Sequence, residues 1–336
     1  MKTKDNVKIK QPPILFNQTQ EIIKKAEKIL GKKLIVYWTS YSGAICDNDV
    51  VALYNLFQRI GKNEEIALYI KSKGGDVEAA LRIVNIIRAY NKKVTALIPL
   101  ESASSATLIA LGADEIQMGP LAHLSPIDSS STHELSPVDE ILHRKVSVSQ
   151  DEIYRISKLW KQNGNDSHVH PYQELFKYIH PLVIGALDRS SSLSIKICKE
   201  ILSYHLKDEK ECERISNLLN SEFPSHGYPI TLRQAQAIGL NSVTMDEELN
   251  DMLLELNVMY SEMAQRAFTD FDEANYHDNQ VLNIHEADGV QIYFQNDKDW
   301  NYLKDERRWQ VLNDESSWHR LEVINGKVVN NILHIS

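Results

Sequence analysis

The chain has 336 residues, 43% of them hydrophobic, which is enough to bury one large core or two smaller ones. Its formal net charge of −9 argues against the basic surface that general nucleic-acid binding requires. The three cysteines are isolated and form no Cys-x-x-Cys pair, which predicts a reduced, cytoplasmic protein. No run approaches the roughly 18 apolar residues of a membrane span, so none is predicted.

The N-terminal segment, residues 1–30, is expected to be a polar arm followed by an amphipathic helix. Apolar residues recur at helical spacing over residues 18–30, and Gly31 can end that helix. A longer amphipathic helix is predicted over 245–267. The apolar stripe of the first helix needs a surface to cover, either on its own body or on a neighbouring subunit, and the apolar faces of both helices are available for subunit assembly.

From residue 31 onward, strands and helices alternate through short turns. Strands are expected at 34–39, 66–71, 93–98 and 115–118, and helices at 49–60, 76–90 and 103–112. Asp47 or Asn48 can cap the first of these helices, and Gly112 can end the last. This alternation predicts right-handed βαβ units and an α/β fold.

A serine cluster lies where the strand at 93–98 gives way to the helix at 103–112. At such a helix N-terminus, Ser102, Ser104 and Ser105 would lie beside unpaired backbone N–H groups. Those donors can hold the oxyanion that forms when a hydroxyl attacks a carbonyl. Helix capping explains the same serines, and spacing alone favours that explanation.

A glycine pair follows the strand at 66–71, and further short motifs follow the serine cluster. Gly74 and Gly75 can adopt positive φ and let a ligand approach the backbone closely. Later motifs are Ala-Asp-Glu-Ile-Gln-Met-Gly-Pro at 113–120, Leu-Ser-Pro-Ile-Asp at 124–128, and a run at 226–240 that opens with His-Gly-Tyr-Pro-Ile.

In order and spacing, these motifs resemble the Clp/crotonase superfamily. They are most similar to its serine-protease branch, which contains the signal peptide peptidases and the serine dehydrogenase proteinases. The resemblance covers about residues 30–260. It implies an α/β, Clp/crotonase-like spiral of ββα units with a helical C-terminal part and a small β-rich tail. The protease domain would span 31–270, with 129–173 as an insertion or lid and 275–336 as the tail.

The resemblance also implies a function. Matched onto the family pattern, Ser104 is the nucleophile of a serine endopeptidase, with Ser102 or Ser105 as alternatives. The N–H groups of Gly75 and Ser105 would form the oxyanion hole, and Gly74 would allow the turn. The enzyme would need no ATP, metal or other cofactor, would act on a peptide or protein, and would assemble as a homo-oligomer.

The general base stays open. The position that matches the histidine of a Clp-type triad is Ile127, whereas the signal peptide peptidase branch uses a lysine kept neutral by burial. The candidate lysines are Lys145, Lys196 and Lys199, and His226 is a further candidate base.

Two features motivate an alternative function. The family usually has Ser-x-Gly at the nucleophile, and here the glycine is replaced by Ala106. Together with the unassigned base, this keeps a catalytically silent assembly or binding subunit as the alternative. Acyl-CoA chemistry of the crotonase type ranks lower, because a serine stands at the nucleophile position.

The remaining segments are predicted from local pattern. A helix over 149–160 opens with a capping box of Ser149 and Glu152, and helical segments over 174–206 are expected to break near Pro181 and at 190–192. Asn325 and Gly326 stand between two alternating apolar runs, which predicts a type I′ β-hairpin in the tail.

Overall fold

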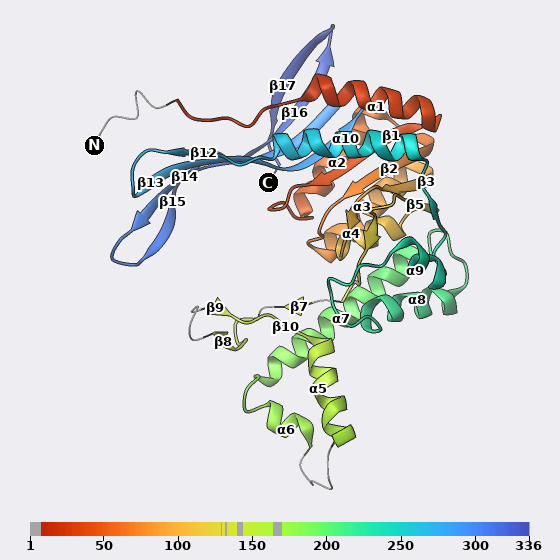
Figure 1. Ribbon diagram of the computed structural model, residues 1–336, viewed down its shortest axis with the longest axis vertical. Helices are drawn as coiled ribbons and strands as arrows, with labels where there is room; N and C mark the ends of the chain where they lie inside the picture. Colours follow the sequence, from red (N-terminus) through yellow and green to blue (C-terminus); the bar gives the residue numbers. More distant parts are fainter. Residues whose placement is uncertain (1–7, 129, 132, 140–143, 164–169, 336) are drawn as a thin grey trace.

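The structure is a computed structural model that describes residues 8–128, 130–131, 133–139, 144–163 and 170–335. Across these residues eleven strands form one mixed sheet, in the order β11-β5-β3-β2-β1-β13-β14-β16-β17, with β12 paired to β13 and β15 paired to β14 (Figure 1). The predicted α/β class, with helices and a strand-rich C-terminal region, is confirmed.

The sheet has a parallel half and an antiparallel half. The parallel half comprises β1 (Lys33–Thr39), β2 (Asn63–Lys71), β3 (Asn91–Ile98), β5 (Glu115–Met118) and β11 (Ser242–Thr244). The antiparallel half comprises β12 (Ala267–Asp270), β13 (Asn275–Ala287), β14 (Val290–Leu303), β15 (Arg308–Asp314), β16 (Ser317–Ile324) and β17 (Lys327–Leu333). The halves meet where β13 pairs antiparallel with β1, so the tail continues the main sheet.

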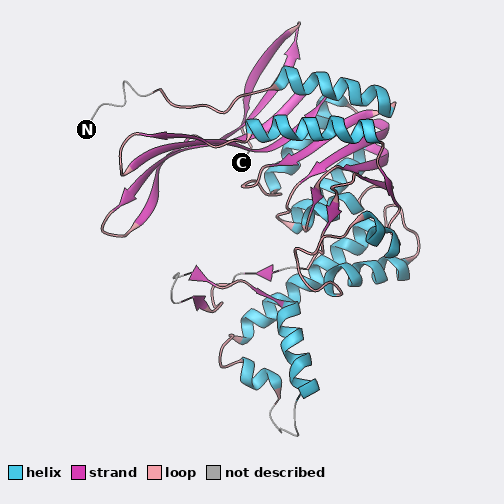
Figure 2. Ribbon diagram, viewed as in Figure 1, coloured by secondary structure: helices cyan, strands magenta, loops and turns pink. Residues whose placement is uncertain are grey.

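Helices cover both faces of the parallel half, as Figure 2 shows. One face carries α2 (Asp47–Ile60), α3 (Val77–Tyr90) and α4 (Ser105–Leu111), and the other carries α1 (Phe16–Leu30) and α10 (Glu247–Met263). Burial on two faces explains why β1 to β3 read as continuous apolar runs rather than as alternating ones.

Of the two surfaces expected for the apolar stripe of α1, its own body and a neighbouring subunit, the structure shows the first, and neither α1 nor α10 leaves its apolar face open for subunit assembly. Ile22, Ile23 and Ala26 of α1 pack into the same core as Leu253 and Leu256 of α10, beneath which lie β1 and β2. Since the sheet of the same chain takes up these faces, a homo-oligomer would have to form through other surfaces.

One helix start differs from the prediction, whereas one helix end agrees with it. Cys46, rather than Asp47 or Asn48, precedes α2, and its N–H donates to the Asp49 carboxylate at 2.9 Å. Gly112 is the C-cap of α4, as predicted, with an ordinary helical φ of −70°. A side chain there would meet Val84 of α3 at 2.8 Å, so this glycine serves close helix packing.

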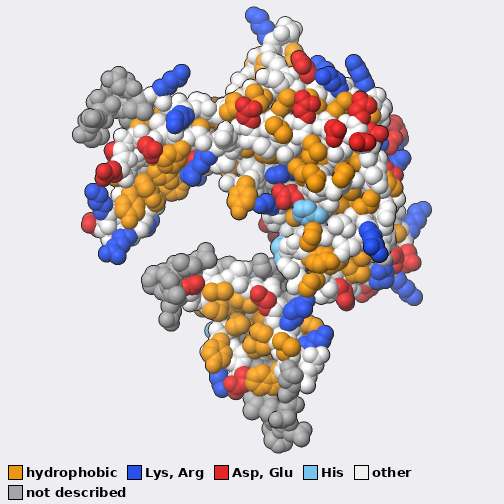
Figure 3. Space-filling view, viewed as in Figure 1, with side chains coloured by type: hydrophobic (Ala, Val, Ile, Leu, Met, Phe, Trp, Pro, Cys, Tyr) orange, Lys and Arg blue, Asp and Glu red, His pale blue; other side chains and the backbone are white. Residues whose placement is uncertain are grey.

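A helical module lies between β5 and β11 in sequence, in the region where an insertion or lid was predicted. It contains the two-residue strands β7 (Ser130–Ser131), β8 (Val138–Asp139), β9 (Arg144–Lys145) and β10 (Val148–Ser149), and the helices α5 (Gln150–Asn163), α6 (Pro171–Leu175) and α7 (Pro181–Leu202). Ser149 and Glu152 form the expected capping box, with bonds of 3.2 and 2.9 Å. Hydrophobic side chains gather on this module (Figure 3). Tyr154 and Phe176 are among its exposed hydrophobic residues.

The predicted break in α7 at residues 190–192 is wrong, although the helix does begin at Pro181. Ser191 accepts a hydrogen bond of 2.8 Å from Asn220, and Ser194 is buried. These small side chains let α7 pack closely against α8 (Glu209–Ser221), and α9 (Leu232–Ala237) leads from there to β11. Among the other expected features, α10 ends at Met263 rather than 267, and Asn325 and Gly326 have the positive φ values, 51° and 75°, of a type I′ turn.

Candidate active site at two facing bends

The glycine and serine bends lie side by side because they follow neighbouring parallel strands. β2 runs into the glycine bend and β3 into the serine bend, so both leave the same edge of the sheet. The Ser72 N–H donates to the Glu101 carbonyl at 3.1 Å, and the Ala103 N–H donates to the Ser72 carbonyl at 2.9 Å. This short ladder, which includes β4 (Glu101–Ser102), aligns the bends residue by residue.

Gly74 and Ser104 are in close contact. A Cβ added to Gly74 would lie 2.7 Å from the Ser104 Cβ and 3.2 Å from its Oγ. Gly74 also has a φ of +106°, which L side chains rarely adopt. Both the space and the backbone angle therefore require glycine opposite the serine.

Ser104 stands on a strained turn at the N-terminus of α4. It is one of three non-glycine residues in the described chain with positive φ, at 54°. Such backbone conformations cost about 1–3 kcal/mol and persist only where the surroundings hold them. Here the Ser104 N–H donates to the Ser125 hydroxyl at 2.7 Å. The turn thus directs the Ser104 side chain out of the helix, and the residue is half-buried.

The two neighbouring serines are enclosed. Ser102 is fully buried, and its hydroxyl donates to the Ala106 carbonyl at 2.9 Å. The Ser105 hydroxyl is buried without a hydrogen-bond partner among the described residues. Of the cluster, Ser104 is the residue whose hydroxyl a substrate could reach.

Two backbone N–H groups belong to residues next to the contact between Gly74 and Ser104, one in each bend. Ser105 is the first residue of α4, and Gly75 is an exposed residue of the glycine bend. Within the described residues, neither N–H has an intramolecular acceptor. A helix N-terminus leaves its first N–H groups unpaired, so the Ser105 donor follows from the fold itself. Two free donors beside a hydroxyl match the needs of an oxyanion hole.

The three predicted lysines do not contact the Ser104 hydroxyl in the described structure. Lys145 on β9 and Lys196 on α7 are exposed, and Lys199 pairs with Glu213 of α8 at 3.4 Å. A lysine base is kept neutral by burial, and none of the three is buried. The identity of the base therefore stays a prediction.

A lysine that the sequence analysis did not single out is largely buried beside the glycine bend. Lys71 ends β2, donates to the Thr39 carbonyl at 3.0 Å, and lies 3.6 Å from Glu101. Burial lowers the pKa of Lys71. However, its ammonium lies over the Trp38 ring, on the face that carries α1 and α10, whereas Ser104 heads α4 on the other face.

His226 is paired with a carboxylate. Its Nδ1 lies 2.9 Å from the Asp128 Oδ1, and this hydrogen bond raises the pKa of His226. Asp128 follows Ser125, which holds the Ser104 N–H, by three residues. The late histidine motif and the Leu-Ser-Pro-Ile-Asp motif thus meet in space, near the support of the serine turn.

Ser125 is a supporting residue that the sequence did not reveal. The side chain of Thr107 donates to the Ser125 carbonyl at 2.9 Å and accepts its N–H at 3.1 Å. The signal was present in the Leu-Ser-Pro-Ile-Asp motif that follows β6 (His123–Leu124), but the motif alone does not say what its serine holds.

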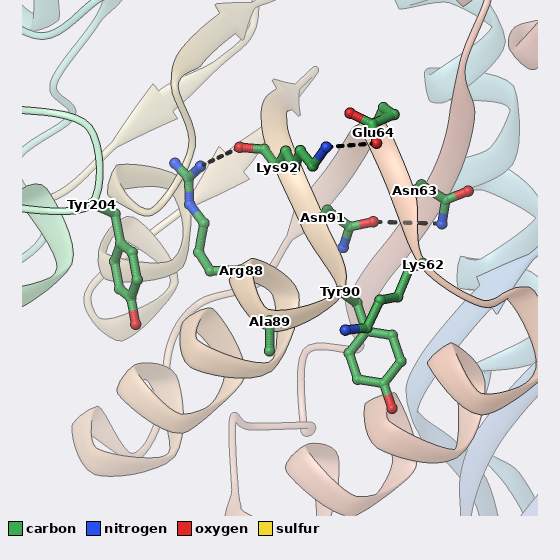
Figure 4. A pocket seen from close by; sticks show the side chains of 9 residues that line it. All are labelled: Lys62, Asn63, Glu64, Arg88, Ala89, Tyr90, Asn91, Lys92 and Tyr204. Atoms are coloured by element: carbon green, nitrogen blue, oxygen red, sulfur yellow. Dashed lines mark hydrogen bonds and ion pairs between the residues drawn. The ribbon is translucent and has the colours of Figure 1, made fainter.

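A separate cavity of about 520 Å³ lies at the opposite end of β2 and β3 (Figure 4). Lys92 in its lining pairs with Glu64 at 2.8 Å, and Arg88 pairs with Asp114 at 2.9 Å. Because residues 62–64 and 91–92 begin the strands whose other ends carry the bends, this cavity is not part of the serine site.

Comparison with protein families identifies the segment that carries both bends. A family model described as ClpP-like SDH-type serine proteinase matches residues 45–156. Over this stretch the chain is similar to the ClpP-like, SDH-type serine proteinases. The matched residues include the glycine pair, the serine turn and Ser125, so the resemblance stated from the motifs is confirmed.

The curated relatives that match this chain are distant in sequence. Two uncharacterized proteins of Methanocaldococcus jannaschii are 26% and 25% identical over 195 residues, covering 58% and 57% of this chain. The chain spans 59% and 56% of the lengths of these relatives.

Solved protease structures are similar at low identity. A membrane-bound stomatin-specific protease is 14% identical, over 70% of this chain and 87% of the other, with a TM-score of 0.38. ClpP1 of Listeria monocytogenes is 16% identical, over 70% of this chain and 99% of the other, with a TM-score of 0.34. Among the residues that the structure describes, no helix has both the length and the apolar character needed to cross a bilayer.

Proposed function

We propose that this protein is a serine endopeptidase in which Ser104 is the nucleophile. The observation that carries the proposal is the contact between Gly74 and Ser104, next to which the N–H groups of Gly75 and Ser105 have no acceptor among the described residues. The substrate would be a peptide or a protein, and a homo-oligomer is the expected assembly.

The geometry supports a two-step acyl transfer. The Ser104 oxygen attacks the scissile carbonyl carbon while a base takes the hydroxyl proton. The N–H groups of Gly75 and Ser105 donate to the oxyanion that develops. The protonated base then gives its proton to the leaving amine, and water hydrolyses the acyl-enzyme in the reverse sense.

In this proposal the base is a lysine, with Lys145, Lys196 and Lys199 as the candidates. Their exposure does not exclude them, because catalytic hydrogen bonds are often long before substrate binds and tighten in the complex. The bond between His226 and Asp128 favours one second candidate, an imidazole base oriented by a carboxylate.

The first experiment compares Ser104→Ala with Ser105→Ala in a peptide-hydrolysis assay. Ser104→Ala should lower kcat about 10⁴-fold or more, because the loss of a serine nucleophile removes the covalent step. Ser105→Ala keeps its backbone N–H and deletes a hydroxyl that has no partner, so its activity should stay within a few-fold. Activity should persist with a chelator and without nucleotide.

Unchanged hydrolysis by a folded Ser104→Ala variant would overturn the proposal. A wild-type protein that hydrolyses no peptide would favour the catalytically silent subunit. Single substitutions of Lys145, Lys196, Lys199 and His226 by methionine assign the base, since the base variant alone should lose activity without a matching loss of stability.

A further inference from the structure

The C-terminal strand β13 reaches the loop beside the glycine bend. β13 pairs with β1 on one side and with β14 on the other, and its register against β14 shifts between Val281 and Asn283. Bulges of this kind bend a strand and re-aim its side chains. Here Val281 and Ile284 face the core under α1 and α10, whereas Asn283 and His285 point to the face that carries α2.

On that face, the two side chains meet a fully buried carboxylate. Asn283 donates to the Asp49 Oδ1 at 2.8 Å, and the His285 Nε2 lies 2.9 Å from the same oxygen. The other oxygen, Oδ2, accepts from the Tyr37 hydroxyl at 2.7 Å and from the Cys46 N–H at 2.9 Å. A buried carboxylate with four partners has a fixed position, because loss of any donor would leave part of its charge unpaired.

The same groups fix the turn at residues 44–46. The Asn283 amide also donates to the Ala44 carbonyl at 2.9 Å, while Asp49 holds the Cys46 N–H. The turn is therefore held on both sides of Ile45, by one side chain from β13 and by one that β13 supports.

Ile45 in turn holds the glycine bend. Its N–H donates to the Gly74 carbonyl at 3.0 Å, and its carbonyl accepts the Asp76 N–H at 2.9 Å. A Cβ on Gly75 would lie 2.4 Å from the backbone of Ile45, so the two segments are in direct contact. The position of the Gly75 N–H is thus set by Ile45 and its neighbours.

We infer that Asn283 and His285 are positioning residues for the oxyanion hole, acting through Asp49 and the 44–46 turn on the Gly75 N–H. This inference rests on the proposed function, since it concerns the donors that would stabilise the oxyanion beside Ser104. It assigns a role to the C-terminal extension, which supplies the far support of a bend that lies some 200 residues earlier in the chain.

A neighbouring residue on the same strand offers a matched control. Glu286 points to the opposite face, where Thr19, Gln20, Tyr260 and Gln291 donate to its carboxylate. It is as buried as His285, at 0% exposure, but no hydrogen bond of the described structure links its side chain to the 44–46 turn. A change at Glu286 should therefore disturb β13 without moving the glycine bend.

The test measures the rate at which a fluorophosphonate labels the full-length protein, at a temperature where each variant is folded. Asn283→Ala should lower the labelling rate about tenfold to a hundredfold, because small displacements of catalytic groups cost rates of that order. Glu286→Gln should label at a rate within about twofold of the wild type, even where its Tm falls by as much as that of Asn283→Ala.

A second pair of variants separates positioning from bulk. His285→Leu removes the donor to Asp49 and should also slow labelling, whereas His285→Gln keeps an amide donor and should restore most of the rate. Hydrogen exchange of the 74–77 backbone should rise in Asn283→Ala and His285→Leu, and stay at the wild-type level in Glu286→Gln.

The outcomes distinguish the two claims. If the wild type is labelled at Ser104 but Asn283→Ala and Glu286→Gln slow labelling equally, or neither does, the inference is overturned and the proposed function stands. If the wild type is not labelled, the proposed function fails. In that case hydrogen exchange of the 74–77 backbone in the variants still decides whether β13 holds the glycine bend in place.

Discussion

The parallel and antiparallel halves of the sheet contribute to the site in different ways. The parallel half carries the bends, because β2 and β3 end side by side and each leads into a helix. The antiparallel half offers no residue within hydrogen-bond distance of Ser104 among those described, yet Asn283 and His285 of β13 bond to the carboxylate behind the glycine bend. The parallel half therefore presents the bends, and the antiparallel half holds the segment that supports the glycine bend.

The largest effect is expected from a change in the parallel half, at the contact between Gly74 and Ser104. Gly74→Ala should lower the hydrolysis rate about a hundredfold or more, because the new Cβ would lie 2.7 Å from the Ser104 Cβ at a φ of +106°. We also expect a loss of about 1–3 kcal/mol in the free energy of unfolding from backbone strain. Initial rates and denaturant unfolding of the same samples measure both effects.

Gly31 provides the control for that change. It ends α1 with a φ of +63°, and nothing lies within 4 Å of an added Cβ. Gly31→Ala should therefore cost backbone strain alone and leave the hydrolysis rate intact. Equal activity in the two variants would show that the Gly74 contact does not matter for the reaction.

The smallest expected effect concerns the far face of the antiparallel half. Burial raises the pKa of the Glu286 carboxyl, outweighing the donors that lower it. The native state then holds this proton at a pH where the unfolded chain has released it. The contribution of Glu286 to the free energy of unfolding is fully present below the unfolded pKa of about 4.3. It is lost as pH rises through the pKa of Glu286 in the native state.

Glu286→Gln removes this titration and places an amide against donors, which should cost about 1–3 kcal/mol of stability at low pH. The difference in unfolding free energy between wild type and variant should shrink as pH rises from 4 through the native pKa. Urea unfolding across that range checks it, and a difference that grows with pH would contradict the assigned direction. The hydrolysis rate per folded molecule should not change.

The parallel half could be predicted from sequence because its signals are local. Apolar runs bounded by glycine and proline predicted β1, β2, β3 and β5 to within three residues of their observed bounds. The close approach of the two bends followed from the resemblance, since neighbouring parallel strands end at the same edge.

The features that could not be predicted from sequence depend on contacts between residues that are far apart in the chain. The pairing of β13 with β1 joins residues some 250 positions apart, and no local pattern encodes it. The buried cluster around Asp49 was missed for the same reason, because nothing in the local sequence marks Asn283 and His285 as its partners. The apolar faces of α1 and α10 were likewise readable, but what covers them was not.

The most direct test of the account is to map the residue that a fluorophosphonate modifies in the full-length protein by peptide mass spectrometry. If Ser104 is the nucleophile, one adduct is expected, on Ser104. It should be absent from Ser104→Ala and retained in Ser105→Ala. An adduct on another residue, or none in folded protein that hydrolyses peptides, would contradict it.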